Sequence, residues 1–364
     1  RCALVIGGAT VDRGLVRHGE TVALKHQLLL YCTPRPTQLA PLRSYPTESV
    51  HTFGEPDAHG MVGEAPASWE LRDQLAFCAL ADAHALLLGE SGSGKELAAQ
   101  AIHRLSRRSN KPMISRNAAT FPPGIIDAEL FGNVKDYPNP GMEARGGVIG
   151  EASGSSLFLD EIAELPSELQ AHLLRVLDAG GEYQRLGDAQ VRRADLRLIA
   201  ATNRDPSEIK HDLLARLTLR VTLPGLDDRR EDIPLLVRHL LRAAARKSPN
   251  IAEHFFEPNG EPRIDPDLVE ALVRHRYHHH VRELETLLWR AIGASKGRYI
   301  ALSDDLRTAI EPEETAPASA TEPTKEEIDA ALARHDQKVA RAYKDLGLKS
   351  RYALYRLMKK YDLA

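Results

Sequence analysis

The sequence predicts an α/β protein built on a parallel sheet and followed by a small all-α domain. Between residues 61 and 225, helical patterns alternate with short apolar runs at 85–88, 113–115, 156–159, 196–200 and 219–223. Continuous apolar runs bounded by turns are typical of buried parallel strands joined by crossover helices. A glycine-rich loop follows the first run, and the segments after residue 225 carry helical periodicity only. These three observations define the predicted fold class.

The elements follow in order along the chain. Residues 1–33 contain short β patterns at 4–6, 21–24 and 28–31, and residues 34–60 begin Pro- and Thr-rich, which is typical of a linker. Residues 61–225 form the predicted α/β core, and residues 226–302 a helical subdomain with helices at 233–246, 266–275 and 281–294. Residues 303–324 hold six acids against one Arg, with three prolines, which predicts an acidic flexible linker. Residues 325–364 predict three helices, at 325–335, 338–346 and 350–361.

Composition excludes several classes of protein. At 364 residues and 43% hydrophobic content, the chain can build more than one core, which excludes a disordered or collagen-like chain. Lys and Arg number 48 and Asp and Glu 51, so a nucleic-acid site has to be local. The basic tail, with eight Lys or Arg against two Asp from Lys338 onward, is such a patch.

Compartment and completeness follow from a few further features. No apolar run approaches the roughly 20 residues of a membrane span, so we expect no membrane partner. The three widely spaced cysteines favour a reducing compartment, and we expect a cytoplasmic protein. The chain begins with Arg1 rather than Met, so we expect a fragment of a longer protein.

Gly89-Glu90-Ser91-Gly92-Ser93-Gly94-Lys95 fits the phosphate-loop pattern G-x-x-x-x-G-K between an apolar run and a helical stretch. In such a loop, backbone N–H groups converge on phosphate oxygens, the helix adds its positive end, and Lys95 reaches the terminal phosphates. The alternative is a Gly- and Ser-rich turn before a helix. Glu96 stands where a Ser or Thr usually helps to hold magnesium.

Two carboxylates, Asp160 and Glu161, follow the apolar run at 157–159. Asp160 suits Mg²⁺ and Glu161 suits the activation of a water molecule. A buried strand that simply ends in acids is the alternative. The phosphate loop upstream favours nucleotide hydrolysis.

These motifs resemble those of the AAA+ ATPase activators of sigma-54 RNA polymerase, also called bacterial enhancer-binding proteins. The resemblance extends from residue 61 to the end of the chain. Its pieces are GESGSGKE at 89–96, ELFG at 129–132, LFLDEI at 157–162, LLRVLDAGGEYQRLG at 173–187, AATNRD at 200–205, RREDIPLL at 229–236 and VREL at 281–284. It implies an AAA+ P-loop sheet with a helical lid, and it accounts for Glu96, which this family carries there.

The resemblance also implies a role for each matching residue. Lys95 would bind phosphates, Asp160 would hold Mg²⁺ and Glu161 would polarise the attacking water. The implied nucleotide-binding set is Gly89, Glu90, Ser91, Gly92, Ser93, Gly94, Lys95, Glu96, the γ-phosphate sensor Thr202 and Asn203, and the lid sensor Arg282.

Two further residues acquire roles from the resemblance. Asn117 matches the asparagine that restrains the catalytic glutamate. Arg216 resembles an arginine finger that reaches the nucleotide of a neighbouring subunit, which implies a ring, most simply a hexamer. The alternatives are a turn residue for Asn117 and solvated helix-face charges for Arg216 and Arg282.

The sequence departs from the family at three places. The family's GAFTGA loop, which touches sigma-54, is replaced by Asp136, Tyr137, Pro138, Asn139, Pro140 and Gly141, so the expected Phe and Thr are absent. Lys210 stands in place of a second arginine finger. His278-His279-His280 replaces Pro-Gly-Asn, and because no paired Cys or acidic cluster accompanies these histidines or His275, a metal site is disfavoured.

The two ends resemble known modules. Residues 325–364 look like the factor-for-inversion-stimulation type of helix-turn-helix, with Gly347 at the turn; the alternative is a basic helical hairpin that packs on the ATPase. The implied DNA-contacting residues are Lys349, Ser350, Arg351, Tyr352, Arg356, Lys359 and Lys360. Residues 19–31 resemble the closing strands of a forkhead-associated domain, to which we assign no phosphopeptide site. An unidentified β sensor or a linker strand is the alternative there.

The predicted function is that of a ring-forming, Mg-ATP-dependent transcription regulator. It would bind DNA upstream of promoters and remodel the sigma-54 RNA polymerase holoenzyme. One alternative is a DNA-binding AAA+ regulator that acts without sigma-54. The other is an AAA+ enzyme that remodels a different protein, with the basic tail as an adaptor.

Overall fold

The computed structural model describes residues 3–24, 28–122, 124–137, 139–178, 180–310, 323–335, 339–348, 351–361 and 363. The chain divides into two compact units. We call them the lid unit, which consists of Arg1–Ala81, Glu90–Leu105 and Leu223–Glu313, and the sheet unit, which consists of Asp82–Gly89, Ser106–Thr222 and Glu314–Ala364. Each is described by itself.

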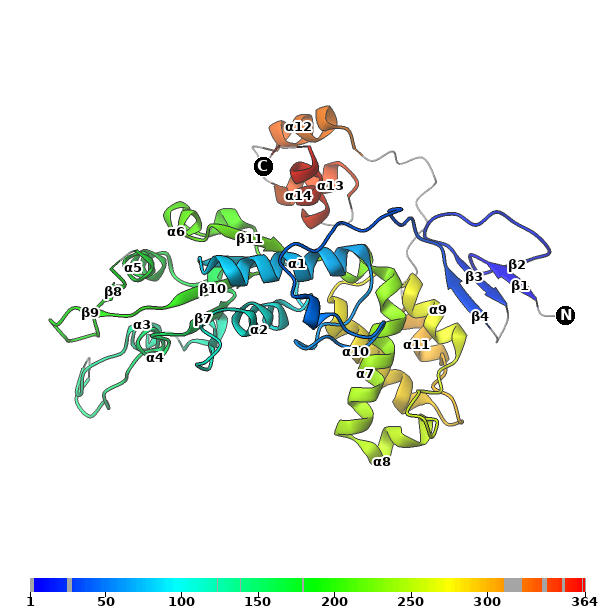
Figure 1. Cartoon of the computed structure of the whole chain (residues 1–364), viewed down its shortest axis with the longest axis horizontal. Helices are drawn as coiled ribbons and strands as arrows, with labels where there is room; N and C mark the ends of the chain where they lie inside the picture. The colour runs from blue at the N-terminus through cyan, green and yellow to red at the C-terminus, as the bar shows by residue number, and fades with distance from the viewer. Residues whose placement is uncertain are drawn as a thin grey trace. The chain divides into compact units, whose positions relative to one another are not determined.

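The sheet unit is built on a five-stranded parallel sheet (Figure 1). Its strands are β5 (Ala85–Leu88), β6 (Ile114–Asn117), β7 (Ser156–Asp160), β10 (Arg197–Thr202) and β11 (Leu219–Thr222), in the order β11-β5-β10-β7-β6. All residues of β5 and β10 are buried, which explains the continuous apolar runs at 85–88 and 198–201. The predicted parallel sheet and its five strands are confirmed, with shifts of one or two residues at the ends.

Before residue 223, the rest of the sheet unit consists of short helices and one small hairpin. The helices are α3 (Ile126–Phe131), α4 (Val148–Glu151), α5 (Ser167–Leu177) and α6 (His211–Arg216), with 3-10 turns η2 (Ala118–Thr120), η3 (Ile162–Glu164) and η4 (Pro206–Glu208). On α5, Leu169, Leu173 and Val176 are buried at helical spacing in the core of this unit. Strands β8 (Glu182–Tyr183) and β9 (Arg192–Arg193) pair antiparallel in a hairpin that was not predicted from the sequence.

The lid unit is largely helical. Its helices are α1 (Pro66–Ala81), α2 (Lys95–Leu105), α7 (Ile233–Lys247), α8 (Pro249–Ala252), α9 (Pro266–Arg274), α10 (His280–Ala294) and α11 (Asp304–Ala309). Its 3-10 turns are η1 (Thr47–Ser49), η5 (Leu226–Asp228), η6 (Arg230–Asp232) and η7 (Glu253–Phe255). Asp265 accepts a hydrogen bond from the Asp267 amide and Pro266 opens α9, which is the usual start of a helix. The predicted helical lid is confirmed.

Two segments predicted to be linkers contain buried residues. The predicted flexible segment at 303–324 begins with α11, where Leu306 and Ile310 are buried in the lid core. The predicted linker at 34–60 contains a buried Asp57, which pairs with buried Arg72 at 2.8 Å. Average composition over a window does not detect one or two such anchoring residues. Residues 311–322 lie outside the described part of the chain.

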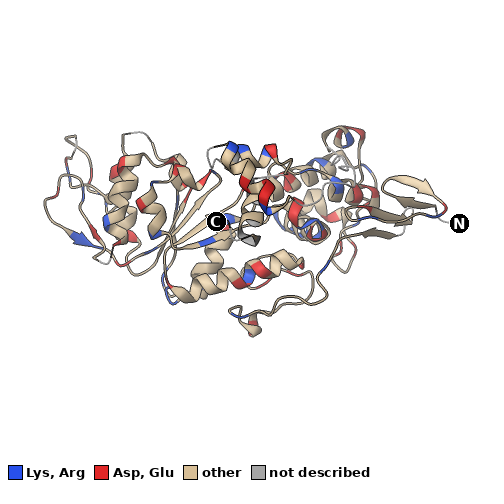
Figure 2. Ribbon diagram, turned by 90° about the horizontal axis from the view of Figure 1, so that it is seen from above, with Lys and Arg blue, Asp and Glu red and all other residues tan. Residues whose placement is uncertain are grey.

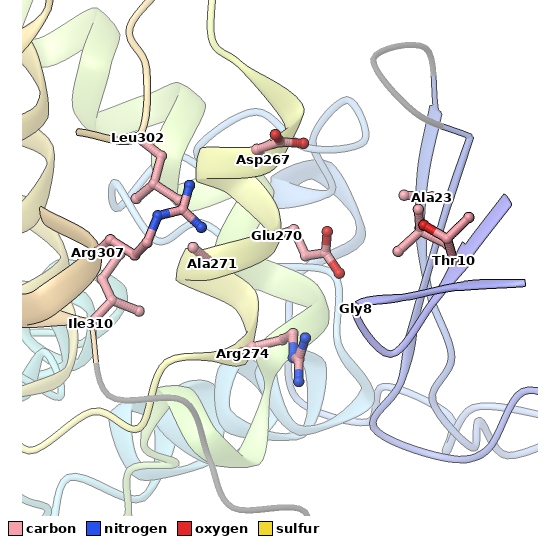
Figure 3. A pocket seen from close by; sticks show the side chains of 11 residues that line it. Gly8, Thr10, Ala23, Asp267, Glu270, Ala271, Arg274, Leu302, Arg307 and Ile310 are labelled. Atoms are coloured by element: carbon pink, nitrogen blue, oxygen red, sulfur yellow. The ribbon is translucent and has the colours of Figure 1, made fainter. Parts of the chain in front are cut away.

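A small antiparallel sheet begins the lid unit. Its strands are β1 (Leu4–Ile6), β2 (Ala9–Val11), β3 (Thr21–Leu24) and β4 (Leu28–Tyr31), in the order β2-β1-β3-β4, and β2 was not predicted. The Thr21 hydroxyl donates to the Glu270 carboxylate on α9. Figure 3 shows Glu270 and Arg274 directed from α9 toward the strands, around a hollow of about 530 Å³.

The C-terminal part of the chain forms three helices with a core of their own. They are α12 (Lys325–Arg334), α13 (Val339–Asp345) and α14 (Arg351–Lys360), close to the predicted positions. Thr324 and Glu327 form a capping box at the start of α12, and Ile328, Leu332 and Leu354 are in the core. Basic and acidic residues are interspersed along most helices (Figure 2). None of the helices described is both long enough and apolar enough to cross a membrane.

Candidate functional site

The carboxyl ends of β5, β10 and β7 lie at one edge of the sheet, because these three strands are parallel neighbours. Gly89, the first glycine of the phosphate-loop motif, donates its N–H to the carbonyl of Thr202 at 3.4 Å. The loop therefore leaves the sheet beside the end of β10. In parallel α/β sheets this edge is where ligands bind.

Asp160 and Glu161 stand at the end of β7. The Asp160 carboxylate accepts from the Glu161 N–H at 3.0 Å and lies 3.5 Å from the Asn117 amide nitrogen at the end of β6. Glu161 adopts a left-handed backbone with φ of +52°, and its carboxylate accepts from the Asn203 N–H at 3.1 Å. A strained backbone at a non-glycine residue is common at functional sites. The ends of β6, β7 and β10 thus bring together four residues that the sequence had singled out.

The contacts of Asn117 differ in detail from its implied role. Its amide nitrogen is directed to Asp160, and its carbonyl oxygen accepts from the Ala119 N–H at 2.9 Å. Asn117 therefore helps to orient the acid that would hold the metal. Thr202 is fully buried, and its hydroxyl accepts from the Arg204 N–H at 3.0 Å, which fixes the turn that carries Asn203.

The phosphate loop itself has the features that a phosphate requires. Lys95 begins α2, is largely buried, and donates to the carbonyl of Glu90 at 3.3 Å. The Ser93 hydroxyl is buried and has no hydrogen-bond partner among the described residues. At Gly94 an added Cβ would meet nothing within 4 Å, so the backbone faces open space. A buried donor without a partner, beside an accessible backbone at a helix start, fits a phosphate group.

The start of α10 contacts this loop. Arg282 donates from Nη1 to the Ser91 hydroxyl at 3.1 Å, and the Val281 N–H donates to the Gly92 carbonyl at 3.2 Å. Gly92 has φ of +82°, and a Cβ there would lie 2.1 Å from the carbonyl oxygen of His279. Only glycine fits this approach. The predicted lid sensor Arg282 therefore lies on the phosphate loop.

The comparisons with known proteins agree with this geometry. A family model for the sigma-54 interaction domain matches residues 61–223, and one for the AAA+ ATPase lid domain matches residues 227–323. The transcriptional regulatory protein ZraR of Salmonella typhimurium LT2 is 35% identical over 312 residues, which are 82% of this chain and 68% of ZraR. The formate hydrogenlyase transcriptional activator FhlA of Escherichia coli K12 is 37% identical over 277 residues, 74% of this chain and 37% of FhlA.

A solved structure gives the same result. The crystal structure of NtrX from Brucella abortus is 30% identical, has a TM-score of 0.61, and matches over 82% of this chain and 69% of NtrX. A second NtrX structure is a complex with ATP. The chain belongs to the sigma-54-dependent transcriptional activators. It is an AAA+ ATPase homologue that uses ATP, with Mg²⁺ as the usual ion, and the match favours the activator function over a regulator that acts without sigma-54.

The finger residues predicted for this activator lie on and beside α6. Arg216 ends α6 and donates from Nε to Asp178 at 2.7 Å, with both side chains about half exposed. Such a surface pair contributes little stability, so the guanidinium can exchange partners at low cost. The Lys210 N–H precedes α6 and donates to the Gln170 side chain at 2.8 Å.

The loop that replaces the activators' sigma-54 contact motif has a defined structure. Buried Asn133 donates from its amide nitrogen to the carbonyls of Val134, Tyr137 and Glu143, at 2.9, 3.2 and 3.0 Å. Asp136, with φ of +61°, accepts from the Gly141 N–H at 2.8 Å. We call residues 133–145 the contact loop; within it, Pro138 lies outside the described residues. Sequence reasoning missed Asn133 because its partners lie up to ten residues away.

Tyr137 connects the contact loop to the hairpin β8–β9. A Cβ added at Gly187 would lie 2.6 Å from the ring of Tyr137, so the ring packs directly on this glycine. The Tyr137 side chain remains 43% exposed. The loop therefore presents an exposed aromatic side chain, while hydrogen bonds from Asn133 hold its backbone. The GEYQRLG part of the family motif ends at Gly187, but it gave no signal of this contact.

His278, His279 and His280 replace the family's Pro-Gly-Asn. With nearby His275, they do not form a metal centre in the described structure. His275 Nε2 lies 2.8 Å from Glu283, and Glu283 also accepts from the backbone N–H groups of His278 and His279. Burial acts to raise the pKa of Glu283, but these hydrogen bonds outweigh it and hold that pKa below its usual value. Across the residues the structure describes, no group of three or more His, Cys, Asp or Glu is arranged to bind a metal.

The predicted DNA-contacting residues are only partly described. Lys349 and Ser350 lie outside the described residues. The backbones of Arg351, Tyr352, Arg356, Lys359 and Lys360 are helical in α14, and their side chains are not described. The structure thus gives a third helix of ten residues and leaves its contact surface as a prediction from sequence.

Proposed function

We propose that this activator hydrolyses Mg-ATP at the carboxyl edge of its sheet and uses that hydrolysis to remodel the sigma-54 RNA polymerase holoenzyme. One observation carries the proposal most directly. At the end of β7, Asp160 and Glu161 are oriented by Asn117 and Asn203, one strand away from β5, which leads into the phosphate loop. Acid, base and phosphate-binding loop thus start from the same edge of the sheet, with β10 between β7 and β5.

Each residue of the site has a distinct task in this proposal. Asp160 holds Mg²⁺, which neutralises negative charge on the phosphates when it is bound. Glu161 accepts the proton of the attacking water, and the Asn203 N–H fixes the carboxylate that does so. Lys95, the Ser93 hydroxyl and the backbone N–H groups of the loop bind phosphate oxygens. Arg282 completes the site from the lid.

The ring is the second part of the proposal. Arg216 is half exposed, and among the described residues it pairs with half-exposed Asp178, as a finger that serves a neighbouring subunit requires. A finger supplied in trans makes hydrolysis depend on assembly, and we propose a hexamer. Lys210 offers a compact ammonium where a second planar guanidinium is expected, so it acts as a point charge.

The contact loop couples hydrolysis to sigma-54. Its backbone is held internally by Asn133 and Asp136, and Tyr137 supplies an exposed aromatic face. We propose that this face replaces the family's phenylalanine in the contact. The three C-terminal helices, with their excess of Lys and Arg, bind DNA upstream of promoters through α14.

The test is complex formation between the full chain and sigma-54 in the presence of ADP and aluminium fluoride, a mimic of the transition state. We expect a complex that elutes as one species, together with ATP hydrolysis by the chain alone. Hydrolysis without a complex would contradict the sigma-54 coupling, and the absence of hydrolysis at any protein concentration would contradict the enzyme assignment. DNA binding is tested with Lys359 and Lys360 replaced by Ala, which should weaken affinity and lower its salt dependence.

A further inference from the structure

His280 is the last of the three consecutive histidines and the first residue of α10. Its backbone is in the left-handed region, with φ of +44°, and its side chain is only 5% exposed. Among residues other than glycine, Asn, Asp and His adopt this conformation most readily. The backbone at this position therefore explains how His280 can stand where the resembled family carries asparagine.

The ring of His280 joins two segments that are far apart in the sequence. Nε2 lies 3.2 Å from the carboxylate of Glu90, the second residue of the phosphate loop. Nδ1 accepts from the N–H of Leu226 at 3.3 Å, where the chain enters the lid helices. A Cβ on Gly225 would lie 2.5 Å from the ring, so the glycine makes room for it. His280 thus bridges the phosphate loop and the entry of the lid.

The hydrogen-bond pattern defines the ring's role. A neutral imidazole has one donor and one acceptor nitrogen. Because Nδ1 accepts from Leu226, the proton resides on Nε2, which donates to Glu90. Both nitrogens of the buried ring are then satisfied, and a side chain without nitrogens would lose the links to Glu90 and to Leu226.

The residues around His280 hold the same loop. The Gly92 backbone accepts from the Val281 N–H, and Arg282 reaches Ser91. Residues 280–282 therefore contact residues 90–92 through three separate hydrogen-bonding links. Only the link made by His280 extends further, to Leu226, among the contacts the structure describes here.

We propose that His280 is a positioning residue that orders the phosphate loop for nucleotide binding by tying Glu90 to the entry of the lid. The inference rests on the proposed ATPase function of this loop. Without the ring nitrogens, the phosphate loop has to become ordered when the nucleotide binds. The free energy of this ordering is subtracted from the free energy of binding, so the affinity for the nucleotide falls. The reacting groups Asp160 and Glu161 are held by other contacts, so the rate of the chemical step stays the same.

The main variant is His280→Phe in the full chain, because it keeps a ring above Gly225 and removes both nitrogens. We expect KM for ATP, and Kd for a fluorescent ATP analogue, to rise about tenfold, with kcat within about twofold of the wild type. His280→Asn suits the left-handed backbone, but its shorter side chain reaches one partner at most, so we expect an intermediate rise. His278→Asn, at an exposed neighbouring side chain, is the matched control and should leave both constants unchanged.

The outcomes separate the inference from the proposed function. Unchanged Kd and KM in His280→Phe, or a fall confined to kcat, would overturn the positioning role. Thermal unfolding monitors the fold, and if the Phe variant melts below the assay temperature, the Asn variant decides by the same criteria. A wild-type chain that binds the analogue without hydrolysing ATP would refute the proposed ATPase, while the Kd comparison would still test His280.

Discussion

The phosphate loop and the contact loop differ in how their polar groups are satisfied. In the phosphate loop the Ser93 hydroxyl is buried without a partner among the described residues, and the backbone at Gly94 faces open space. In the contact loop, Asn133 bonds three carbonyls and Asp136 bonds the Gly141 amide. One loop reserves its donors for a ligand, whereas the other uses them to fix its own shape.

This difference matches the two tasks that we propose for these loops, phosphate binding and contact with sigma-54. A phosphate brings its own acceptors, so a loop that binds it gains by leaving donors unpaired. A protein partner requires a surface of defined shape, because loop ordering costs affinity when it happens on binding. Substitutions in the two loops should therefore have separable effects on ATP turnover and on sigma-54 engagement.

The largest effect should come from Glu161→Gln, which should impair ATP hydrolysis and leave the contact loop unchanged. The amide keeps the shape of the side chain but cannot accept a proton, so kcat should fall by about 10²- to 10⁴-fold. ATP affinity should change by less than about threefold, since Glu161 acts on the water rather than the phosphates. Steady-state hydrolysis and binding of a fluorescent ATP analogue measure the two. Glu168→Gln, at an exposed acid on α5, is the control. Unchanged turnover in the Glu161 variant would refute the assignment of Glu161 as the general base.

The next effect should come from Asn133→Ala, which breaks only the contact loop. Three carbonyls lose their donor, so we expect a loss of about 1–3 kcal/mol of stability and a weaker sigma-54 complex. KM for ATP should stay within about twofold. The control is Asn110→Ala, the same change at an exposed position outside the contact loop. Equal weakening of the complex by both variants would show that the internal hydrogen bonds do not matter.

A smaller effect should follow from Glu283→Gln. This change weakens the hydrogen bonds that hold the turn before α10, the helix whose start contacts the phosphate loop. The folded pKa of Glu283 lies below its usual value near 4.5, so its contribution is present above that pH and is lost as the pH falls further. We expect the wild type to exceed the variant in stability by about 1–2 kcal/mol at pH 7, and by less near pH 4. Thermal unfolding at both pH values measures this, with Glu285→Gln as the control. A difference that does not change with pH would contradict the assignment.

The sequence predicted those parts of the molecule whose signal is local. Strand β5 was predicted at its observed bounds because four buried apolar residues lie between turn signals. Asp160 and Glu161 were found because they follow such a strand directly in a chain that also carries a phosphate loop. The structure adds that Asn203 holds the glutamate, a contact across 42 residues that no local pattern encodes.

The missed features depend on distant or very short contacts. The hairpin β8–β9 has two residues in each strand, too few for an alternating pattern. Helix α11 is anchored mainly by Leu306, within a segment whose overall composition is acidic. His280 was noted only as a departure from a motif, because its partners Glu90 and Leu226 lie 190 and 54 residues away in the sequence. Long-range pairing of single side chains is what the fold adds to the sequence.

The smallest effect should come from Thr21→Val, which removes the hydroxyl that donates to Glu270 and leaves both loops intact. Valine keeps the shape and β propensity of this fully buried position, so only the hydrogen bond is lost, at about 1 kcal/mol. Hydrogen exchange at the amides of β3 should become faster, while exchange in α10 and the values of KM and kcat stay unchanged. Glu270 lies on α9, whereas the contacts with the phosphate loop come from the start of α10. A change in KM would therefore show that the small sheet influences nucleotide binding through the lid. That result would contradict the separation of the two loops from the rest of the chain.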